Sequence, residues 1–264
     1  MKKAIVFSTI LFASCAVSKN RPAVSFAPNP VVAHRGAFKK NNHPENSIAS
    51  LKEAIRLQCT GSEFDVRMTA DDSLIVNHDP HYNKLEIEKT TFHELAVHKL
   101  SNGETLPTLR QYLLAGLEGN RQTRLVLEIK PSASKERGKQ IAEKVVALVK
   151  ELKAEPLTVY ISFDYAILQK VLEVSPGVPT QYLNGDQPPE QLKRDGISGA
   201  DYHFSVFKAR PEWIESAKKN GIALNAWTVN SEEEIKWLLA KGFDYITANE
   251  PELALTLAGK AAGQ

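Results

Sequence analysis

The strongest constraint on the fold is an alternation of short apolar runs with amphipathic, helix-length stretches along most of the 264-residue chain. Short apolar runs are typical of buried strands, and amphipathic stretches are typical of helices that cover a sheet. Because a helical crossover returns the chain to the sheet in the same direction, this order predicts βα units and a parallel sheet.

Eight strands are expected, each followed by a helix, which predicts a single α/β domain with the (β/α)8 TIM-barrel fold over residues 29–264. The first helix is expected to include Pro44-Glu45-Asn46-Ser47 as its first turn. The expected strands are 31–34, 63–66, 125–129, 159–163, 180–183, 201–204, 224–227 and 245–247. The expected helices are 45–57, 109–117, 135–152, 165–173, 190–193, 212–219, 232–240 and one that begins near residue 251.

A ninth apolar run, Leu74–His78, lies too close to the second strand for a helical crossover. The intervening residues 70–73 are Ala-Asp-Asp-Ser, which favour a turn. We therefore expect an antiparallel hairpin near the barrel mouth, which returns His78 to a position beside Asp65. Residues 80–107 are expected to form an irregular excursion over the site.

The N-terminus is typical of an export signal. Lys2 and Lys3 precede an apolar segment, residues 4–13, and a small-residue cleavage site ends at Cys15. This pattern predicts a signal peptide over residues 1–14, a lipid-bearing Cys15 and a tether over residues 15–28. We therefore expect an exported lipoprotein of a bacterial cell envelope, whose lipid anchors it to the membrane. The alternative is an ordinary secretory signal and a periplasmic or secreted protein, since Phe12 stands where lipoprotein signals usually have leucine.

Composition argues against a nucleic-acid partner. Loss of Lys2 and Lys3 with the signal would bring the 33 basic residues level with the 31 acidic ones. A chain without a basic surplus or an arginine-rich run lacks the electrostatic attraction to phosphate backbones on which nucleic-acid binding depends.

Titratable side chains gather in and after the early strands, at His34, Glu63, Asp65, His78 and Glu128. Ends of barrel strands are where enzymes of this architecture place catalytic groups. Three carboxylates at one mouth repel each other unless a cation is present, and hard oxygen ligands favour Ca²⁺ or Mg²⁺. Imidazole titrates near neutrality, so the two histidines suit acid–base catalysis. The pattern predicts a metal-assisted phosphodiesterase.

Three further side chains are candidates for substrate binding. Arg35 offers a planar fork for a phosphate oxygen, and Lys130 could supply a second positive charge. Trp227 ends an expected strand, where it would form part of the wall of the substrate pocket or pack in the core.

These motifs, taken in order, resemble the glycerophosphodiester phosphodiesterase family from Val31 to Pro251. The matching segments are HRG (34–36), PENS (44–47), EFDVRMTADD (63–72), NHD (77–79), LPTL (106–109), EIK (128–130), SF (162–163) and AWTVN (226–230). The resemblance implies a TIM barrel that cleaves glycerophosphodiesters, small-molecule substrates, to glycerol 3-phosphate and an alcohol. It implies catalysis by His34 and His78. It also implies a Ca²⁺ or Mg²⁺ cofactor on Glu63, Asp65 and Glu128.

Two alternatives stay open. The same chemistry could act on lysophospholipids, glycerophosphoinositol or a teichoic-acid-like polymer, and a non-catalytic envelope binding protein could retain the barrel. The chain also departs from the family pattern, since Asn249-Glu250-Pro251 stands where Thr-Asp-x-Pro is usual. The sequence does not say which histidine is the base, which headgroup is preferred or how many copies associate.

The expected lipid on Cys15 has a direct test. Cys15→Ser should release the exported protein from the membrane fraction or leave it unprocessed, because several acyl chains on one residue are needed for firm anchoring. Mass spectrometry of the mature N-terminus is the measurement. An unmodified residue other than Cys15 at that terminus would contradict the lipoprotein prediction.

Overall fold

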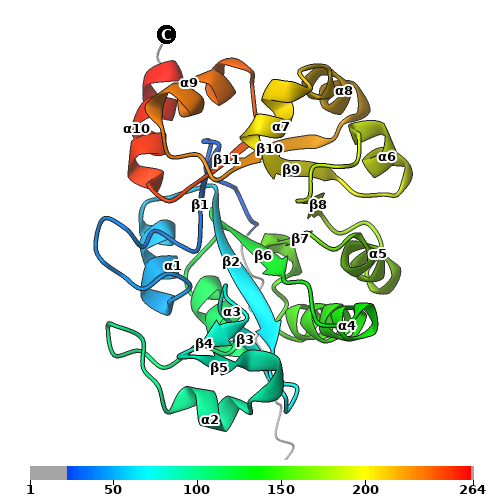
Figure 1. Cartoon of the computed structure of the whole chain (residues 1–264). Helices are drawn as coiled ribbons and strands as arrows, with labels where there is room; N and C mark the ends of the chain where they lie inside the picture. The colour runs from blue at the N-terminus through cyan, green and yellow to red at the C-terminus, as the bar shows by residue number, and fades with distance from the viewer. Residues whose placement is uncertain (1–22, 263–264) are drawn as a thin grey trace, which may run out of the picture.

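The computed structural model describes residues 23–262, so the expected signal peptide, Cys15 and the first part of the tether lie outside the described residues. Within this range, eight parallel strands close into a barrel because β1 pairs with both β2 and β11 (Figure 1). The prediction of a TIM barrel is confirmed. The barrel strands are β1 (Val31–Ala33), β2 (Gly61–Met68), β6 (Arg124–Ile129), β7 (Thr158–Ser162), β8 (Thr180–Tyr182), β9 (Gly199–His203), β10 (Ala223–Trp227) and β11 (Tyr245–Ala248).

Helices surround the barrel on its outer side (Figure 1). Between residues 23 and 262, no helix has both the length and the apolar character needed to cross a bilayer. The covering helices are α1 (Ile48–Arg56), α3 (Leu109–Leu117), α4 (Lys135–Glu151), α5 (Tyr165–Val174), α6 (Pro189–Arg194), α7 (Phe204–Ala209), α8 (Glu212–Asn220), α9 (Glu232–Ala240) and α10 (Pro251–Ala262).

The two-residue period of the strands separates the outer core from the barrel interior. In β6, Leu127 and Ile129 face outward and pack with the buried apolar residues of α4 and α5. Val126 belongs instead to an interior cluster with residues of β1 and β7 and with Leu183, which follows β8. Glu128 and Lys130 share the inward face with Val126, so the alternation that builds the core also directs these charges into the barrel.

The expected hairpin is present. Strand β3 (Leu74–Val76) pairs antiparallel with the end of β2, with Val76 opposite Val66. The excursion that follows contains β4 (His81–Tyr82), β5 (Leu85–Glu86), a 3-10 turn (Ile87–Lys89) and α2 (Phe92–Ala96). Its buried apolar side chains form a cluster of their own with Ile75 of β3. The excursion is therefore a small packed unit beside the barrel mouth.

The expected start of the first helix is wrong. Helix α1 begins at Ile48, and Ser47 is its N-cap, whose hydroxyl accepts a hydrogen bond from the Ser50 N–H (3.0 Å). Asn46 has a φ of +59°, which a helix interior does not allow. Residues 44–47 form a loop because Asn46 is held by a carboxylate of β2, an interaction outside the helix itself.

Part of the expected tether packs on the N-terminal end of the barrel. The Ser25 N–H donates to the Arg121 carbonyl (3.0 Å), and the Ala27 N–H donates to the Gln122 carbonyl (3.0 Å). The guanidinium of Arg124 lies 3.5 Å from the centre of the Phe26 ring. The boundary between tether and domain stays a prediction, because the residues before Ala23 are not described.

Gly36 is expected to be essential for the turn after β1. Its φ is +80°, and a Cβ there would lie 2.4 Å from Ser50 Oγ and 2.6 Å from the Ser50 carbonyl carbon. Gly103 has a similar φ of +86° but no atom within 4 Å of the added Cβ. Gly103→Ala should therefore cost only the backbone strain, roughly 1–2 kcal/mol of unfolding free energy.

Gly36→Ala should cost clearly more than Gly103→Ala in urea unfolding, because it adds a collision with the backbone of α1 to the same strain. Equal losses for the two variants would show that α1 moves freely away from the turn.

Candidate active site

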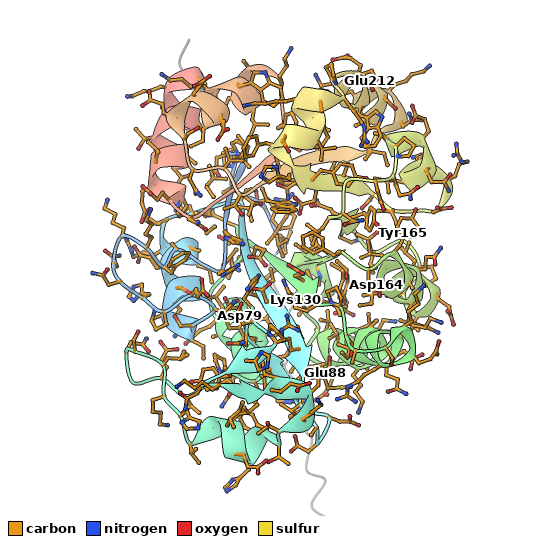
Figure 2. The ribbon with its side chains drawn as sticks, viewed as in Figure 1. Asp79, Glu88, Lys130, Asp164, Tyr165 and Glu212 are labelled. Atoms are coloured by element: carbon orange, nitrogen blue, oxygen red, sulfur yellow. The ribbon has the colours of Figure 1, made fainter. Side chains whose placement is uncertain are left out.

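A cavity of about 110 Å³ lies at the carboxyl ends of the barrel strands. Seven of the residues singled out from the sequence line it: His34, Arg35, Glu63, His78, Glu128, Lys130 and Trp227. Figure 2 shows Lys130 and Asp79 near the centre of the view and Glu212 on an outer helix. The structure thus brings the candidate groups to one place.

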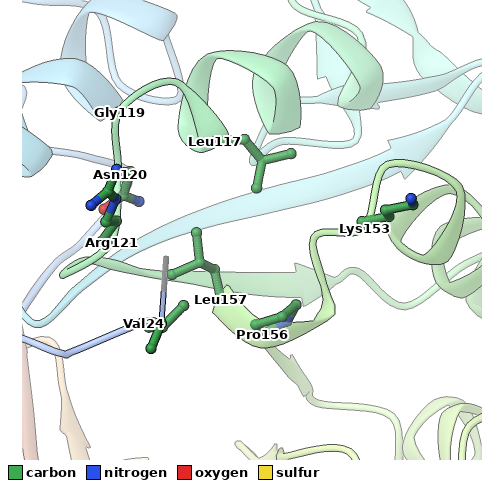
Figure 3. A pocket seen from close by; sticks show the side chains of 9 residues that line it. Val24, Leu117, Gly119, Asn120, Arg121, Lys153, Pro156 and Leu157 are labelled. Atoms are coloured by element: carbon green, nitrogen blue, oxygen red, sulfur yellow. The ribbon is translucent and has the colours of Figure 1, made fainter. Parts of the chain in front are cut away.

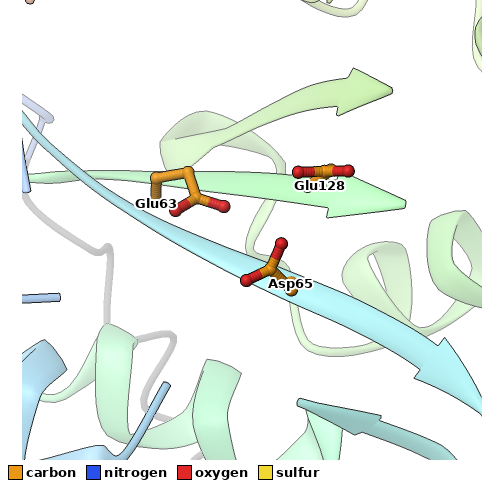
Figure 4. Close-up of side chains that lie close together, drawn as sticks. All are labelled: Glu63, Asp65 and Glu128. Atoms are coloured by element: carbon orange, nitrogen blue, oxygen red, sulfur yellow. The ribbon is translucent and has the colours of Figure 1, made fainter. Parts of the chain in front are cut away.

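The three candidate metal ligands form a buried cluster. Glu63 and Asp65 share the inward face of β2, and Asp65 lies opposite Glu128 of β6 in the strand register. One oxygen atom from each carboxylate lies within 4.8 Å of those of the other two. The carboxylates turn toward one another between the two strands (Figure 4). Only 3% of Glu63, 1% of Asp65 and 6% of Glu128 is exposed, so water screens their repulsion little.

The electrostatic consequences differ among the three acids. Burial, and then the charge of Asp65, raise the pKa of Glu63 well above its usual value and that of Glu128 to about 8. Burial would raise the pKa of Asp65 as well, but the surrounding positive groups, Lys130 foremost, lower it to about 2. Without a further cation the cluster retains protons, and Asp65 is the member that stays ionised.

The donor set suits a divalent cation. Glu63 Oε1 is buried and accepts no hydrogen bond from any described residue. Ca²⁺ ligands lie about 2.3–2.6 Å from the ion, so two ligands of one ion can be about 5 Å apart. The observed spacing falls within that reach, and the oxygens are the hard ligands that Ca²⁺ and Mg²⁺ prefer. Glu63, Asp65 and Glu128 therefore fit a metal site.

Two fixed cations partly balance the cluster. Lys130 Nζ lies 2.9 Å from Glu128 Oε1 and 3.3 Å from Asp65 Oδ1. Arg35 Nη1 donates to Glu45 Oε2 (2.8 Å), and its Nε lies 3.7 Å from Asp65 Oδ2. Both side chains also line the cavity, where they can attract a phosphate.

His34 is held by a residue that sequence reasoning did not assign to the site. Its Nδ1 lies 2.7 Å from the side-chain oxygen of Asn249, which follows β11. An amide oxygen only accepts, so Nδ1 carries the hydrogen and Nε2 is the free acceptor. Nε2 lies 3.8 Å from Glu63 Oε2. Burial, and then the nearby Arg35, lower the pKa of His34 to about 4, so the ring is neutral near pH 7.

His78 has a different environment. It follows β3, and its Nδ1 lies 2.8 Å from a carboxylate oxygen of Asp79. Its carbonyl accepts two hydrogen bonds from the Arg67 guanidinium, at 2.9 and 2.7 Å. The Asn77 N–H donates to the Asp65 carbonyl (3.0 Å). The hairpin therefore brings His78 back to the end of β2, as expected from the turn sequence.

Two other polar residues of the site were not found from the sequence. The Asn46 amide donates to Asp65 Oδ2 (2.8 Å) and accepts from the Asp65 N–H (3.1 Å), which fixes that carboxylate. Asp201 lies in the middle of β9, is 2% exposed and lines the cavity. The two-residue period of β9 was the available signal for Asp201, because it places this acid on the inward face.

Aromatic rings form part of the wall on the side of β7 and β10. The Trp227 indole N–H donates to the Asp201 carbonyl (2.9 Å), which fixes the ring. Phe163 meets Trp227 edge to face, with ring centres 5.3 Å apart. Trp227 lines the cavity and also packs against the interior apolar cluster, so both of its expected positions describe part of its surroundings.

A larger cavity, of about 310 Å³, lies near the opposite ends of β6 and β7 (Figure 3). Its lining includes Val24, Leu117 and Leu157 but no histidine or carboxylate. This cavity is larger than the candidate site, yet none of the residues that line it has a group that exchanges a proton near neutral pH. The smaller cavity is the candidate active site.

Comparison with known proteins shows the family of the chain. The sequence profile of the glycerophosphoryl diester phosphodiesterase family matches residues 34–253. A glycerophosphodiester phosphodiesterase of Caldanaerobacter subterraneus subsp. tengcongensis is 30% identical over 246 residues, 87% of this chain and 98% of the relative. A crystal structure of a glycerophosphodiester phosphodiesterase from Parabacteroides distasonis has a TM-score of 0.86 and 36% identity, covering 90% of this chain and 100% of that chain. A phosphodiesterase of Oleispira antarctica shares the fold at 22% identity, with a TM-score of 0.75, over 89% of this chain and 96% of that chain.

Asp201 should reduce stability at neutral pH. Burial, and then the charge of Glu128, raise its pKa well above 3.8, the value expected in the unfolded chain. The folded state then binds more protons than the unfolded state above that value, so stability falls as pH rises. Asp201→Asn removes this loss. In urea unfolding of metal-free protein, the free energy of unfolding of this variant should exceed that of the wild type by an amount that grows from pH 4 to pH 7.

Asp195 provides a control of opposite sign. The Tyr165 hydroxyl donates to its carboxylate (2.6 Å) and lowers the pKa of Asp195. Asp195→Asn should therefore lose stability relative to the wild type as pH rises from about 2 to 5, the range in which this carboxyl ionises in the folded chain before it does in the unfolded chain. A constant difference between Asp201→Asn and the wild type would contradict the interpretation of Asp201.

Proposed function

The chain belongs to the glycerophosphoryl diester phosphodiesterase family and is a glycerophosphodiester phosphodiesterase, and within that activity we propose that His34 and His78 catalyse release of glycerol 3-phosphate and an alcohol. The observation that carries the proposal is that two histidines with different partners line one cavity with a buried cluster of three carboxylates. A non-catalytic binding protein is excluded by the family.

His34 is the base. Its neutral ring is oriented by Asn249, and Nε2 is free to accept a proton. In this proposal Nε2 takes the proton of the glycerol hydroxyl next to the phosphate, and the hydroxyl oxygen attacks phosphorus. The position of Nε2 near Glu63 places the acceptor beside the carboxylate cluster.

His78 is the acid. Asp79 accepts a hydrogen bond from Nδ1 and orients the ring, so the other nitrogen can donate a proton to the leaving alcohol. The bonds from Arg67 to the His78 carbonyl fix the backbone at this position. The first step breaks the bond between phosphorus and the alcohol oxygen and leaves a cyclic glycerol phosphate.

The second step reverses the two roles. His78 removes a proton from water, water oxygen attacks phosphorus, and His34 returns its proton to the glycerol oxygen as the ring opens. Arg35 and Lys130 bind the phosphate oxygens through both steps and stabilise the charge that develops on them. A divalent cation, Ca²⁺ or Mg²⁺, held by Glu63, Asp65 and Glu128 would supply further positive charge to the phosphate and lower the pKa of the attacking hydroxyl.

Water-soluble glycerophosphodiesters are the proposed substrates. The apolar side chains of the excursion pack into their own cluster, with Ile87, Leu95 and Leu106 almost fully buried, which leaves little apolar surface for an acyl chain. The related Oleispira antarctica phosphodiesterase is described in complex with its product, sn-glycerol-3-phosphate. Lysophospholipids, glycerophosphoinositol and teichoic-acid-like polymers are the alternatives that a substrate panel distinguishes.

We further propose that the enzyme acts outside the cytoplasm as an anchored lipoprotein. The support is the sequence pattern up to Cys15, with its positive start, apolar segment and small residues before cysteine.

Removal of either histidine should abolish most of the activity. His34→Ala and His78→Ala should each lower kcat on glycerophosphocholine by about two to four orders of magnitude, the usual effect of losing a positioned proton-transfer group. His93→Ala, on the exposed surface of α2, is the matched control and should keep wild-type activity. Near wild-type kcat in either histidine variant would refute that histidine's role.

Activity should also disappear with chelator and return with Ca²⁺ or Mg²⁺.

A further inference from the structure

Asp201 is the one acid of the cavity to which the proposed reaction gives no role. Its Oδ1 is buried and has no hydrogen-bond partner within residues 23–262. A buried polar atom without a partner costs free energy, as much as 1–3 kcal/mol from mutational data. An atom of this kind in an active-site cavity is expected to bind part of the substrate.

The barrel places Asp201 across from the carboxylate cluster. Strand β9 lies four positions from β2 in either direction around the closed sheet. Its neighbours Ala200 and Tyr202 pack outward under the helices, so the side chain of Asp201 points into the barrel. Asp201 and Glu128 line the same cavity.

The space between the phosphate-binding groups and Asp201 is small. The whole cavity is about 110 Å³, well below the roughly 300 Å³ at which pockets for drug-sized ligands begin. Its wall on this side consists of Ile161, Leu183 and Trp227. A three-carbon unit suits this space, whereas an acyl chain or a bulky headgroup must extend toward solvent.

Resting on the proposed function, we propose that Asp201 binds the terminal hydroxyl of the glycerol unit and thereby determines specificity. With the phosphate at Arg35 and Lys130, the glycerol carbons extend over Trp227, and the terminal hydroxyl reaches the carboxyl of Asp201. A carboxyl group in either protonation state can hydrogen-bond to a hydroxyl, so the contact does not depend on its ionisation.

This contact explains how the enzyme would discriminate against lysophospholipids. In a 1-acyl lysophospholipid the terminal hydroxyl is esterified and can no longer donate a hydrogen bond. The ester also brings an acyl chain toward a site bounded by the buried side chains of Ile161 and Leu183. The unpaired Asp201 oxygen and the lack of space would both disfavour such a substrate.

The test compares glycerophosphocholine with its analogue in which the terminal hydroxyl is replaced by hydrogen, propane-1,2-diol 1-phosphocholine. Both keep the attacking hydroxyl and the phosphodiester. The wild type should have a kcat/KM roughly ten- to a hundredfold higher for glycerophosphocholine, the effect of one hydrogen bond to a carboxyl group. Asp201→Leu, of similar shape, should lose this preference by reacting more slowly with glycerophosphocholine only. Asp201→Asn should keep the preference, because its amide also forms hydrogen bonds.

The outcomes separate the two proposals. A wild type that hydrolyses both substrates equally overturns the role of Asp201 and needs no variant. Equal slowing of both substrates in Asp201→Leu shows a structural role and also overturns it. A wild type that cleaves neither substrate with Ca²⁺ or Mg²⁺ present overturns the proposed function instead.

Discussion

The repulsion among Glu63, Asp65 and Glu128 is the constraint on which the rest of the site depends. Three buried carboxylates within 4.8 Å cannot all ionise without positive charge nearby. The chain supplies two cations, from the turn after β1 and the end of β6, and both contact Asp65. A divalent cation would balance the negative charge of the carboxylates that these two cations leave uncompensated. The same cation would attract a phosphate.

The barrel architecture allows this cluster of buried charges without loss of the fold. The helices and the outward faces of the strands form two large apolar clusters, so the interior can hold polar groups without loss of the fold. Asp201 is a further polar group of the interior, on the far side of the barrel. Its unpaired carboxyl oxygen lowers stability, but in our proposal it provides a contact for substrate. The outward-facing residues of the strands thus stabilise the fold, and the alternate, inward-facing residues determine specificity.

Most of the fold followed from the sequence, because the βα alternation is local and the closure of eight such units leaves few options. The carboxylates, the cations and the hairpin with His78 were found because each follows or lies in a recognisable strand. Asn46 was misassigned to a helix, since its bond to Asp65 joins residues 19 positions apart that only the folded barrel brings together. Asp201 was missed because the expected strand began at residue 201, which put this acid at the amino end of the strand, whereas β9 begins at Gly199. Asn249 was missed because its contact with His34 spans the closure between the last and first strands.

Thermal unfolding of chelated protein with added Ca²⁺ or Mg²⁺ tests the central claim most directly. The wild type should gain stability with cation concentration, about 2.7 kcal/mol at a hundredfold excess over Kd. Glu63→Gln should not, because it removes the carboxylate whose buried oxygen has no partner among the described residues. Glu118→Gln, a surface change in a residue that pairs with Lys52, should behave as the wild type. An unchanged wild-type Tm at millimolar concentrations of both cations would contradict the account.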